Sequence, residues 1–193
     1  MYLFSFASQR TGHLLSLTLF ALSMTATSAT RAEKADSYAD TIIEAGHSFD
    51  DIKNNVAVLS HGVTISRGTL LIKAEKANLK QAVDGKQNVV LISKPGTPVT
   101  FRQKRDGGPD LWIEGQAESA EYDESTEMVK LISNALVRYL DGKKVTQEQS
   151  GAYLSYDSKN DVFLGTNSTS GQHVEGNSRV RIVIRSKTEK QAD

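Results

Sequence analysis

The chain of 193 residues has no cysteine, only three prolines and one tryptophan. Without cysteine it has no disulfide framework and no chemistry that depends on a thiolate. The sequence also lacks a P-loop, a GxGxxG or GxSxG segment, and any histidines at metal-ligand spacing. Its formal charge is zero at pH 7, so no overall field attracts it to nucleic acid or to an anionic membrane. We therefore expect no metal site and no cofactor.

The sequence contains no segment of helical length with a persuasive apolar period of 3.6 residues. Apolar and polar residues alternate instead, most clearly in Gly62–Ala77. Val63 and Ile65 share one face of its first half, and Leu70 and Ile72 share one face of its second half. A period of two is typical of half-buried strands. The glycine-containing connection between the halves predicts a β-hairpin.

The same pattern of short apolar segments between turn residues continues along the chain. Clusters of Gly, Pro and Asp predict turns near residues 84–86, 94–98, 106–109 and 141–143. Short strands without intervening helices indicate an all-β sandwich, roll or barrel. Besides the hairpin, strands are expected at residues 41–44, 56–60, 88–92, 99–104, 111–115, 117–123, 128–131, 135–140, 151–157, 161–165 and 179–185.

One unit of strand, aspartate-started turn and strand occurs three times. Residues 120–131 resemble residues 154–164, and residues 48–58 form a weaker third copy. Repetition of one hairpin unit favours a stacked, quasi-one-dimensional architecture.

The N-terminus has the pattern of a secretory signal peptide. Arg10 and His13 precede an apolar run over residues 14–24, and small residues follow it. This run is shorter than the roughly 20 residues of a transmembrane helix. We expect cleavage after Ala32, with Ala29 as the second choice; a retained membrane anchor is the alternative. The expected organisation is a signal peptide over 1–32, one β-domain over 33–185 and a polar tail over 186–193.

Charged side chains raise two further questions. A run of acidic residues could contain the paired carboxylates of a glycosidase, but Glu121 and Asp123 fall on the opposite strand face from Ala120 and Tyr122, which favours a solvated surface. We therefore expect no enzyme. Basic residues flank the last strand and fit either as charges that discourage edge pairing or as contacts to anionic lipid phosphates. The acidic run is Glu114, Glu118, Glu121, Asp123, Glu124 and Glu127, and the basic set is Arg179, Arg181, Arg185 and Lys187.

Three segments carry distinctive motifs: residues 62–76 (GVTISRGTLLIKAEK), 94–103 (KPGTPVTFRQ) and 115–123 (GQAESAEYD). In this order they resemble the LptA/OstA family of periplasmic lipopolysaccharide-transport proteins from Gram-negative bacteria. The resemblance extends loosely over residues 38–185. It implies a twisted β-jelly roll, or β-taco, of short antiparallel strands with an open hydrophobic groove.

The resemblance also implies a function and partners. The family binds the acyl chains of lipopolysaccharide and carries the lipid across the periplasm, from the inner to the outer membrane, in a head-to-tail bridge. The implied partners are lipopolysaccharide, an inner-membrane-anchored LptC-like protein, an outer-membrane LptD-like β-barrel and further copies of the chain, with no nucleic acid.

Pattern and resemblance together give two sets of candidate residues. The oligomer edges are expected at Thr41, Ile42, Ile43, Val180, Ile182 and Ile184. The groove lining is expected to include Ile42, Leu59, Val63, Ile65, Leu70, Ile72, Phe101, Ile113, Tyr122, Val129, Leu131 and Val137.

Ordinary core packing is the alternative for each lining residue. For the whole chain, the alternatives are a membrane-anchored relative of the same pathway and a jelly-roll or β-helical carbohydrate-active enzyme or adhesin.

Overall fold

The computed structural model describes residues 36, 39–157, 160 and 162–186. The expected signal peptide and nearly all of the polar tail lie outside the described residues. Within them, no helix is long and apolar enough to cross a membrane. The regular elements are the strands β1 (Thr41–Glu44), β2 (His47–Asp51), β3 (Val56–Arg67), β4 (Leu70–Gln81), β5 (Gln87–Ile92), β6 (Val99–Lys104), β7 (Leu111–Ala117), β8 (Ser119–Asp123), β9 (Met128–Asp141), β10 (Lys144–Asp157), β11 (Val162–Thr166) and β12 (Arg181–Ile184).

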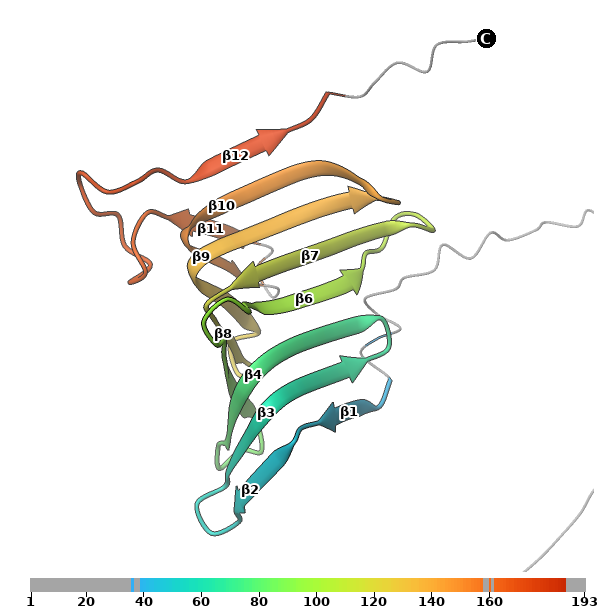
Figure 1. Ribbon diagram of the computed structural model, residues 1–193, viewed down its shortest axis with the longest axis vertical. Coiled ribbons are helices and arrows are strands. Elements are labelled where there is room, and N and C mark those ends of the chain that lie inside the picture. The colour runs from blue at the N-terminus through green and yellow to red at the C-terminus, as the bar shows by residue number, and fades with distance from the viewer. Residues whose placement is uncertain (1–35, 37–38, 158–159, 161, 187–193) are drawn as a thin grey trace, which may run out of the picture.

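All strand pairs are antiparallel, and together they make one sheet that folds over on itself (Figure 1). The front wall has the order β1-β3-β4-β6-β7-β9-β10-β12. The back wall has the order β2-β3-β4-β5-β8-β9-β10-β11. The long strands β3, β4, β9 and β10 contribute one half to each wall. The prediction of an all-β fold is confirmed.

The sheet bends where two residues of one strand oppose one residue of the next. His61 and Gly62 of β3 lie between the paired positions Ser60 and Val63, and both have positive φ. Ser133 and Asn134 of β9 repeat this arrangement opposite a single residue of β10. Extra residues of this kind bend a strand and increase its twist. His, Gly and Asn are also the residues that adopt the left-handed conformation most readily.

A third bend separates β7 from β8 at Glu118. Its backbone N–H donates to the carbonyl of Ser133, and its carbonyl accepts from the N–H of Ser93. The Asn134 amide donates to the Glu118 carboxylate at 2.6 Å. The bend is therefore tied to its neighbours on both sides, and a continuous fold line runs across the sheet.

The buried core lies along this fold line and contains residues of both walls. Val63, Val99 and Val137 come from the front wall, and Leu59 and Leu154 from the back wall. The walls therefore pack on each other through one face, called here the inner face; the opposite face is the outer face.

All three copies of the predicted repeat are hairpins with four-residue turns. They join β2 to β3, β8 to β9 and β10 to β11. In each, the carboxylate of the last strand residue, Asp51, Asp123 or Asp157, accepts backbone N–H groups of the turn. The side chains of Asn54 and Ser125 also donate to Asp51 and Asp123, and these side-chain hydrogen bonds, followed by the backbone ones, lower the pKa of the two carboxyls. An aspartate at this position closes the turn on itself.

Several strand boundaries differ from the sequence-based expectation. The segments 128–131 and 135–140 are halves of one strand, β9, because the two left-handed residues between them bend the strand without ending it. Strand β10 begins at Lys144 rather than at 151, since its polar first half pairs with β9 at the exposed part of the wall. The segment 47–51 is a full strand, β2.

The chain passes from β11 to β12 through an ordered loop. The side chain of Asn167, which is buried, donates to the carbonyl of Val174 and accepts from its N–H group. Val180 packs over Gly151 and Gly165, where added Cβ atoms would approach its methyl groups to 3.4 and 3.1 Å. Val180 therefore packs against β10 and β11 just before β12 begins; that it belongs to an oligomer edge stays a prediction.

Two valines in opposite environments test where the core lies. Val63 is 2 % exposed, whereas Val83 is fully exposed. Val63→Ala should lower the free energy of unfolding by about 2 kcal/mol, because it removes buried methyl groups and leaves a cavity. Val83→Ala should change it by less than about 0.5 kcal/mol. Denaturant unfolding measures both; equal effects of the two substitutions would contradict this position of the core.

Candidate functional site

The inner face of the front wall carries a row of mostly apolar residues with one member in every strand. Pairing places Ile65 beside Ile72, Ile72 beside Phe101, and Phe101 beside Gly115. The row continues to Val137 of β9 and is then interrupted by Gln149 of β10, which pairs with both Val137 and Ile182 of β12; Ile43 of β1 lies at the other end. Side chains directly opposite in paired strands lie on the same face of a sheet. The apolar surface thus extends from β1 to β9 and resumes at β12, beyond Gln149.

The back wall carries two such rows. The row beside the fold line contains Leu59, Ala77, Leu91, Ala120, Leu131 and Leu154. The row farther from the fold line contains Ala57, Leu79, Val89, Tyr122, Val129, Tyr156 and Phe163. A hollow of about 290 Å³ beside Ala57 and Leu79 opens at the β2 end of the second row.

Exposure of the inner face increases with distance from the fold line. Val63, next to the bend, is 2 % exposed, and Ile65 is 9 % exposed. In the same wall Leu70 and Ile72 are half-buried. In the back wall Leu131 is buried, whereas Tyr122 is 39 % exposed. The inner face therefore has a sealed zone at the fold line and a partly open zone beyond it, called here the mouth.

Strand registers place all but one of the expected groove residues on the inner face. Five of them belong to the sealed zone: Leu59, Val63, Ile65, Leu131 and Val137. Ile72, Phe101 and Ile113 are partly buried against that zone. Leu70, Tyr122 and Val129 extend toward the mouth. That any of these residues contacts a lipid stays a prediction.

The prediction that Ile42 lines the groove is wrong, because its side chain lies on the outer face of the sheet. Ile42 pairs with Ser66, whose row continues through Leu71 and Arg102 on the outer face. Ile43 pairs with Ile65 and lies on the inner face. Two adjacent isoleucines in a four-residue strand give no alternation, so the sequence alone could not distinguish them.

Sequence reasoning missed Leu79, Val89, Tyr139 and Phe163, which pack against the sealed zone from its borders. Leu79 and Val89 lie at paired positions of β4 and β5, and both strands alternate correctly from known inner residues. The alternation of these two strands was therefore sufficient to predict Leu79 and Val89. Tyr139 also alternates from a predicted residue, Val137 in β9, beyond the bend at Ser133 and Asn134.

Gly115 and Phe101 form a matched pair in the middle of the front wall. A Cβ atom on Gly115 would overlap the Phe101 ring and lie 2.9 Å from the carbonyl oxygen of Leu136. The ring therefore covers the glycine backbone, and only glycine fits at this position.

Polar and cationic groups lie at the mouth, beyond the apolar rows. Gln103 pairs with Ile113 on the inner face, and the Arg105 guanidinium lies 4.7 Å from the centre of the Tyr139 ring. Burial and the carboxylates of Glu124 and Glu127 raise the pKa of Tyr122, while the charge of Arg67 acts to lower it. Because Arg67 belongs to the front wall and Tyr122 to the back wall, this interaction acts between the walls.

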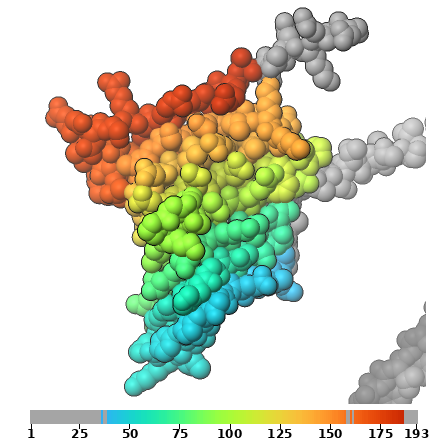
Figure 2. Space-filling model, viewed as in Figure 1, coloured from blue at the N-terminus to red at the C-terminus, as the bar shows by residue number. Residues whose placement is uncertain are grey.

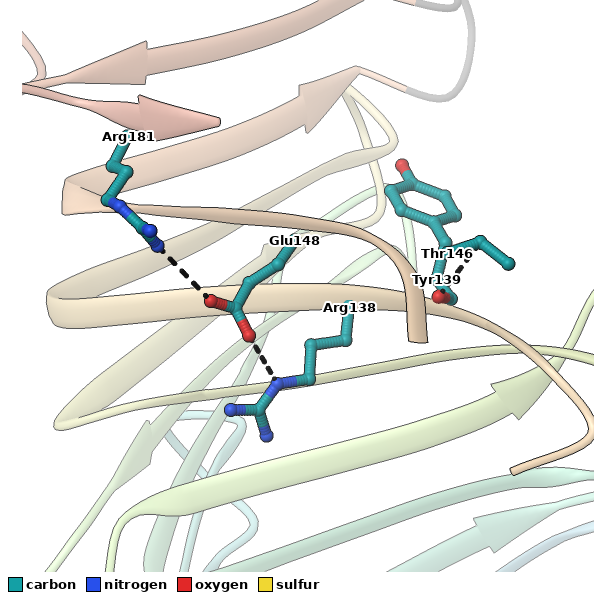
Figure 3. A network of polar contacts seen from close by, with 5 residues as sticks. All are labelled: Arg138, Tyr139, Thr146, Glu148 and Arg181. Carbon is teal, nitrogen blue, oxygen red and sulfur yellow. Dashed lines mark hydrogen bonds and ion pairs between the residues drawn. The ribbon is translucent and has the colours of Figure 1, made fainter. Parts of the chain in front are cut away.

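The outer face is held by ion pairs between strands (Figure 3). Arg138 Nε donates to Glu148 at 2.8 Å, and Arg181 lies 3.7 Å from the same carboxylate. The hydrogen bond from Arg138 lowers the pKa of Glu148, with further help from Arg181 and Arg185. In the back wall Lys130 pairs with Glu121 at 3.0 Å, and this bond raises the pKa of Lys130. Glu121 thus lies on the charged outer face, as expected.

In the part of the chain that the structure describes, no group of three or more His, Asp or Glu side chains is placed to hold a metal ion. His47 and His61 stack edge to face at 6.2 Å between ring centres, and both are exposed.

The fold and its apolar inner face define a β-jelly-roll protein whose main chemical feature is an extended hydrophobic surface. Residues 42–162, more than half of the chain, match the family described as LptA/(LptD N-terminal domain) LPS transport protein. The chain belongs to this family.

Relatives and a solved structure agree with that placement. The lipopolysaccharide export system protein LptA of Haemophilus influenzae is 30 % identical over 109 residues, which are 56 % of this chain and 59 % of the relative. LptA of Escherichia coli K12 is 30 % identical over 125 residues, which are 63 % of each chain. The chain thus spans about six tenths of the length of these relatives.

The crystal structure of LptH, described as the LptA-homologous periplasmic component of the lipopolysaccharide transport device of Pseudomonas aeruginosa, has the same fold. It superimposes with a TM-score of 0.63 at 23 % identity, over 79 % of this chain and 99 % of that chain.

Single cysteines can test the exposure gradient, because the chain has no native cysteine. Tyr122→Cys should react with a maleimide at a rate within about tenfold of the exposed control Val83→Cys. Val63→Cys should react about a hundredfold more slowly than the control, because its modification requires the core to open. Rates are measured by mass spectrometry under native conditions. Fast labelling of Val63→Cys in the folded protein would show that the fold line is not sealed.

Proposed function

We propose that this protein binds lipopolysaccharide through the acyl chains of lipid A and carries it across the periplasm as one link of a protein bridge. Membership of the LPS-transport family supports the cargo. The single observation that carries the proposal is the apolar inner face, which extends from β1 to β9 in the front wall and from β3 to β11 in the back wall and stays partly exposed away from the fold line. On this proposal the walls border an open groove.

The chemistry of the inner face suits acyl chains. Each methylene that leaves water contributes about 0.8 kcal/mol, and no directional contact is required. Val, Ile, Leu and Phe side chains therefore hold a chain without fixing its position along the wall. The sealed zone would form the floor of the groove, and the mouth would leave the sugar part of the lipid in water.

The proposed cellular location and partners follow from the same family resemblance. The segment 1–32 directs export and is removed, the domain extends over 33–185, and the mature protein works in the periplasm without catalysing a reaction. An LptC-like protein at the inner membrane supplies the lipid, and an LptD-like β-barrel at the outer membrane receives it. N-terminal sequencing separates this role from that of an anchored relative, since the mature chain should begin near Glu33.

Both ends of the folded sheet are suited to pairing with further copies. Each wall contains eight strand positions in an antiparallel order, so its first and last strands run in opposite directions. A second copy added by translation would therefore place β1 antiparallel to β12 in the front wall and β2 antiparallel to β11 in the back wall. Such head-to-tail contacts do not close, and they extend into a filament. Figure 2 shows these edges at the lower, blue end and the upper, red end of the molecule.

Side-chain faces and charge select one register for the front wall. Ile43 and Ile182 lie in the same inner row, so pairing them across copies continues that row. The same register places Glu44 opposite Arg181, which adds an attractive pair. All of β1 and most of β12 are exposed at these edges.

Adjacent leucines on opposite faces of β4 test lipid binding. Leu70 lies on the inner face and Leu71 on the outer face. Leu70→Gln should weaken binding of purified lipopolysaccharide about tenfold, because one apolar side chain loses its contact with acyl chains. Leu71→Gln should change the affinity by less than about twofold. Fluorescence titration measures both, with mass spectrometry of lipid that co-purifies from the periplasm as a second readout. Equal affinities of the two variants would place the lipid elsewhere.

Proline in β12 tests the bridge. The N–H of Arg185 donates to Thr146 of β10, so by alternation the N–H of Ile184 points to the free edge. Ile184→Pro should abolish self-association and leave the monomer folded, because it removes a donor only from the free edge. Ile184→Ala, which keeps that donor, should still associate. Sedimentation velocity at several concentrations measures this; assembly of the proline variant would exclude pairing through β12.

A further inference from the structure

The turn between β3 and β4 holds a buried carboxylate that the proposed function does not use. Asp36 lies before β1 and is 5 % exposed. Its side chain accepts hydrogen bonds from Thr69 N at 2.7 Å, Thr69 Oγ1 at 2.6 Å and Gln103 Nε2 at 3.1 Å. A buried carboxylate is costly unless it is well paired, and here three donors surround it.

The electrostatics agree with this geometry. Burial acts to raise the pKa of Asp36, but the hydrogen bonds from Thr69 and Gln103 and the charge of Arg67 outweigh it and hold the pKa below its ordinary value. Asp36 therefore stays ionised at neutral pH. These groups form a cradle of donors around an anion, and the name cradle refers below to Thr69, Gln103 and Arg67.

The front wall alone provides the cradle, without help from Asp36. The turn that presents the N–H of Thr69 depends on Gly68, whose φ is +57°. The N–H of Lys104 in β6 donates to Thr69 Oγ1 at 3.1 Å, which fixes the hydroxyl so that its proton points to the anion. Gln103 and Thr69 are thus held by the β3–β4 hairpin and its neighbour β6, whereas Asp36 reaches them from outside any strand.

The cradle lies at the mouth of the inner face. Gln103 is in the same inner-face row as Ile113 and Tyr139, just beyond the apolar zone. Arg67 acts electrostatically on both Asp36 and Tyr122 of the opposite wall. An amphipathic molecule with its tails on the apolar rows would therefore bring its first polar group to the level of the cradle.

We propose that the cradle binds an anionic phosphate group on the head of the lipid, and that Asp36 occupies it as an internal competitor when no lipid is present. This inference rests on the function proposed above and names the headgroup site of the same surface. Thr69 and Gln103 direct donors at the bound anion and Arg67 is a cation, so the cradle favours a phosphate or a carboxylate over a neutral hydroxyl.

A tethered carboxylate competes strongly with a free ion. An intramolecular ligand has an effective concentration on the order of millimolar, so inorganic phosphate should displace Asp36 poorly. A lipid whose tails already lie on the inner face delivers its phosphate at a similarly high local concentration. The cradle therefore favours the phosphate of a bound lipid over free phosphate.

Removing the competitor tests the proposal. If Asp36 occupies the cradle about nine-tenths of the time, Asp36→Ala should tighten binding of bisphosphorylated lipid A about tenfold. Binding of chemically dephosphorylated lipid A with the same acyl chains should not change. Asp40→Ala, which removes an exposed carboxylate four residues away, should change neither affinity by more than about twofold. Gln103→Leu added to Asp36→Ala should reverse the gain.

Each alternative result has a defined interpretation. Equal changes for the two lipids, or the same gain with Asp40→Ala, would overturn the headgroup site. Displacement of lipid from the Asp36→Ala variant by millimolar inorganic phosphate would assign the cradle to the free ion and overturn its assignment to lipid. Failure of both lipids to bind the native chain would instead reject the proposed function. Thermal unfolding verifies that each variant is folded, and Asp36→Asn repeats the charge change with the volume conserved.

Discussion

The structure depends on one backbone constraint, the fold line along which every long strand changes wall. Pairs of left-handed residues at His61-Gly62 and Ser133-Asn134 each place two residues opposite one. Such bulges turn a strand without ending its hydrogen bonding. Without them the sheet would expose its apolar face along its whole length, whereas the bend brings the two halves of that face together. Secondary structure, core and candidate binding surface therefore have one common cause.

The fold line also explains why the inner face is graded. Walls that meet at a line approach each other most closely there, so Val63 and Leu154 are almost completely buried. Farther out the side chains are of the same kind, but they have fewer neighbours from the opposite wall, and Tyr122 and Tyr156 remain partly exposed. Side chains of the same kind thus stabilise the fold close to the bend and form the candidate surface for apolar cargo farther from it. Neither role requires a separate cavity.

Local patterns predicted much of this architecture. Alternation identified the β3–β4 hairpin, and aspartates in turns identified all three repeated hairpins, because these signals act over a few residues. The bends were not predicted: Ser133-Asn134 looked like the end of a strand, since a left-handed pair leaves the same composition as a turn. The face of Ile42 depends on register, and the packing of Val180 depends on distant glycines, neither of which sequence spacing encodes. The partnership of Asp36 with Gln103, 67 residues apart, was equally inaccessible.

The proposed cradle bears on how a uniform apolar path can release its cargo. The apolar rows continue across most strands of each wall, so an acyl chain would gain or lose little free energy as it moves along them. A bare cradle at one point of each copy would interrupt that uniformity and retain a phosphate strongly. With Asp36 present, departure of the phosphate coincides with return of the carboxylate, and the donors of Thr69 and Gln103 remain satisfied throughout. The retained free energy is then only the difference between two anions, which keeps successive positions on the path nearly equal.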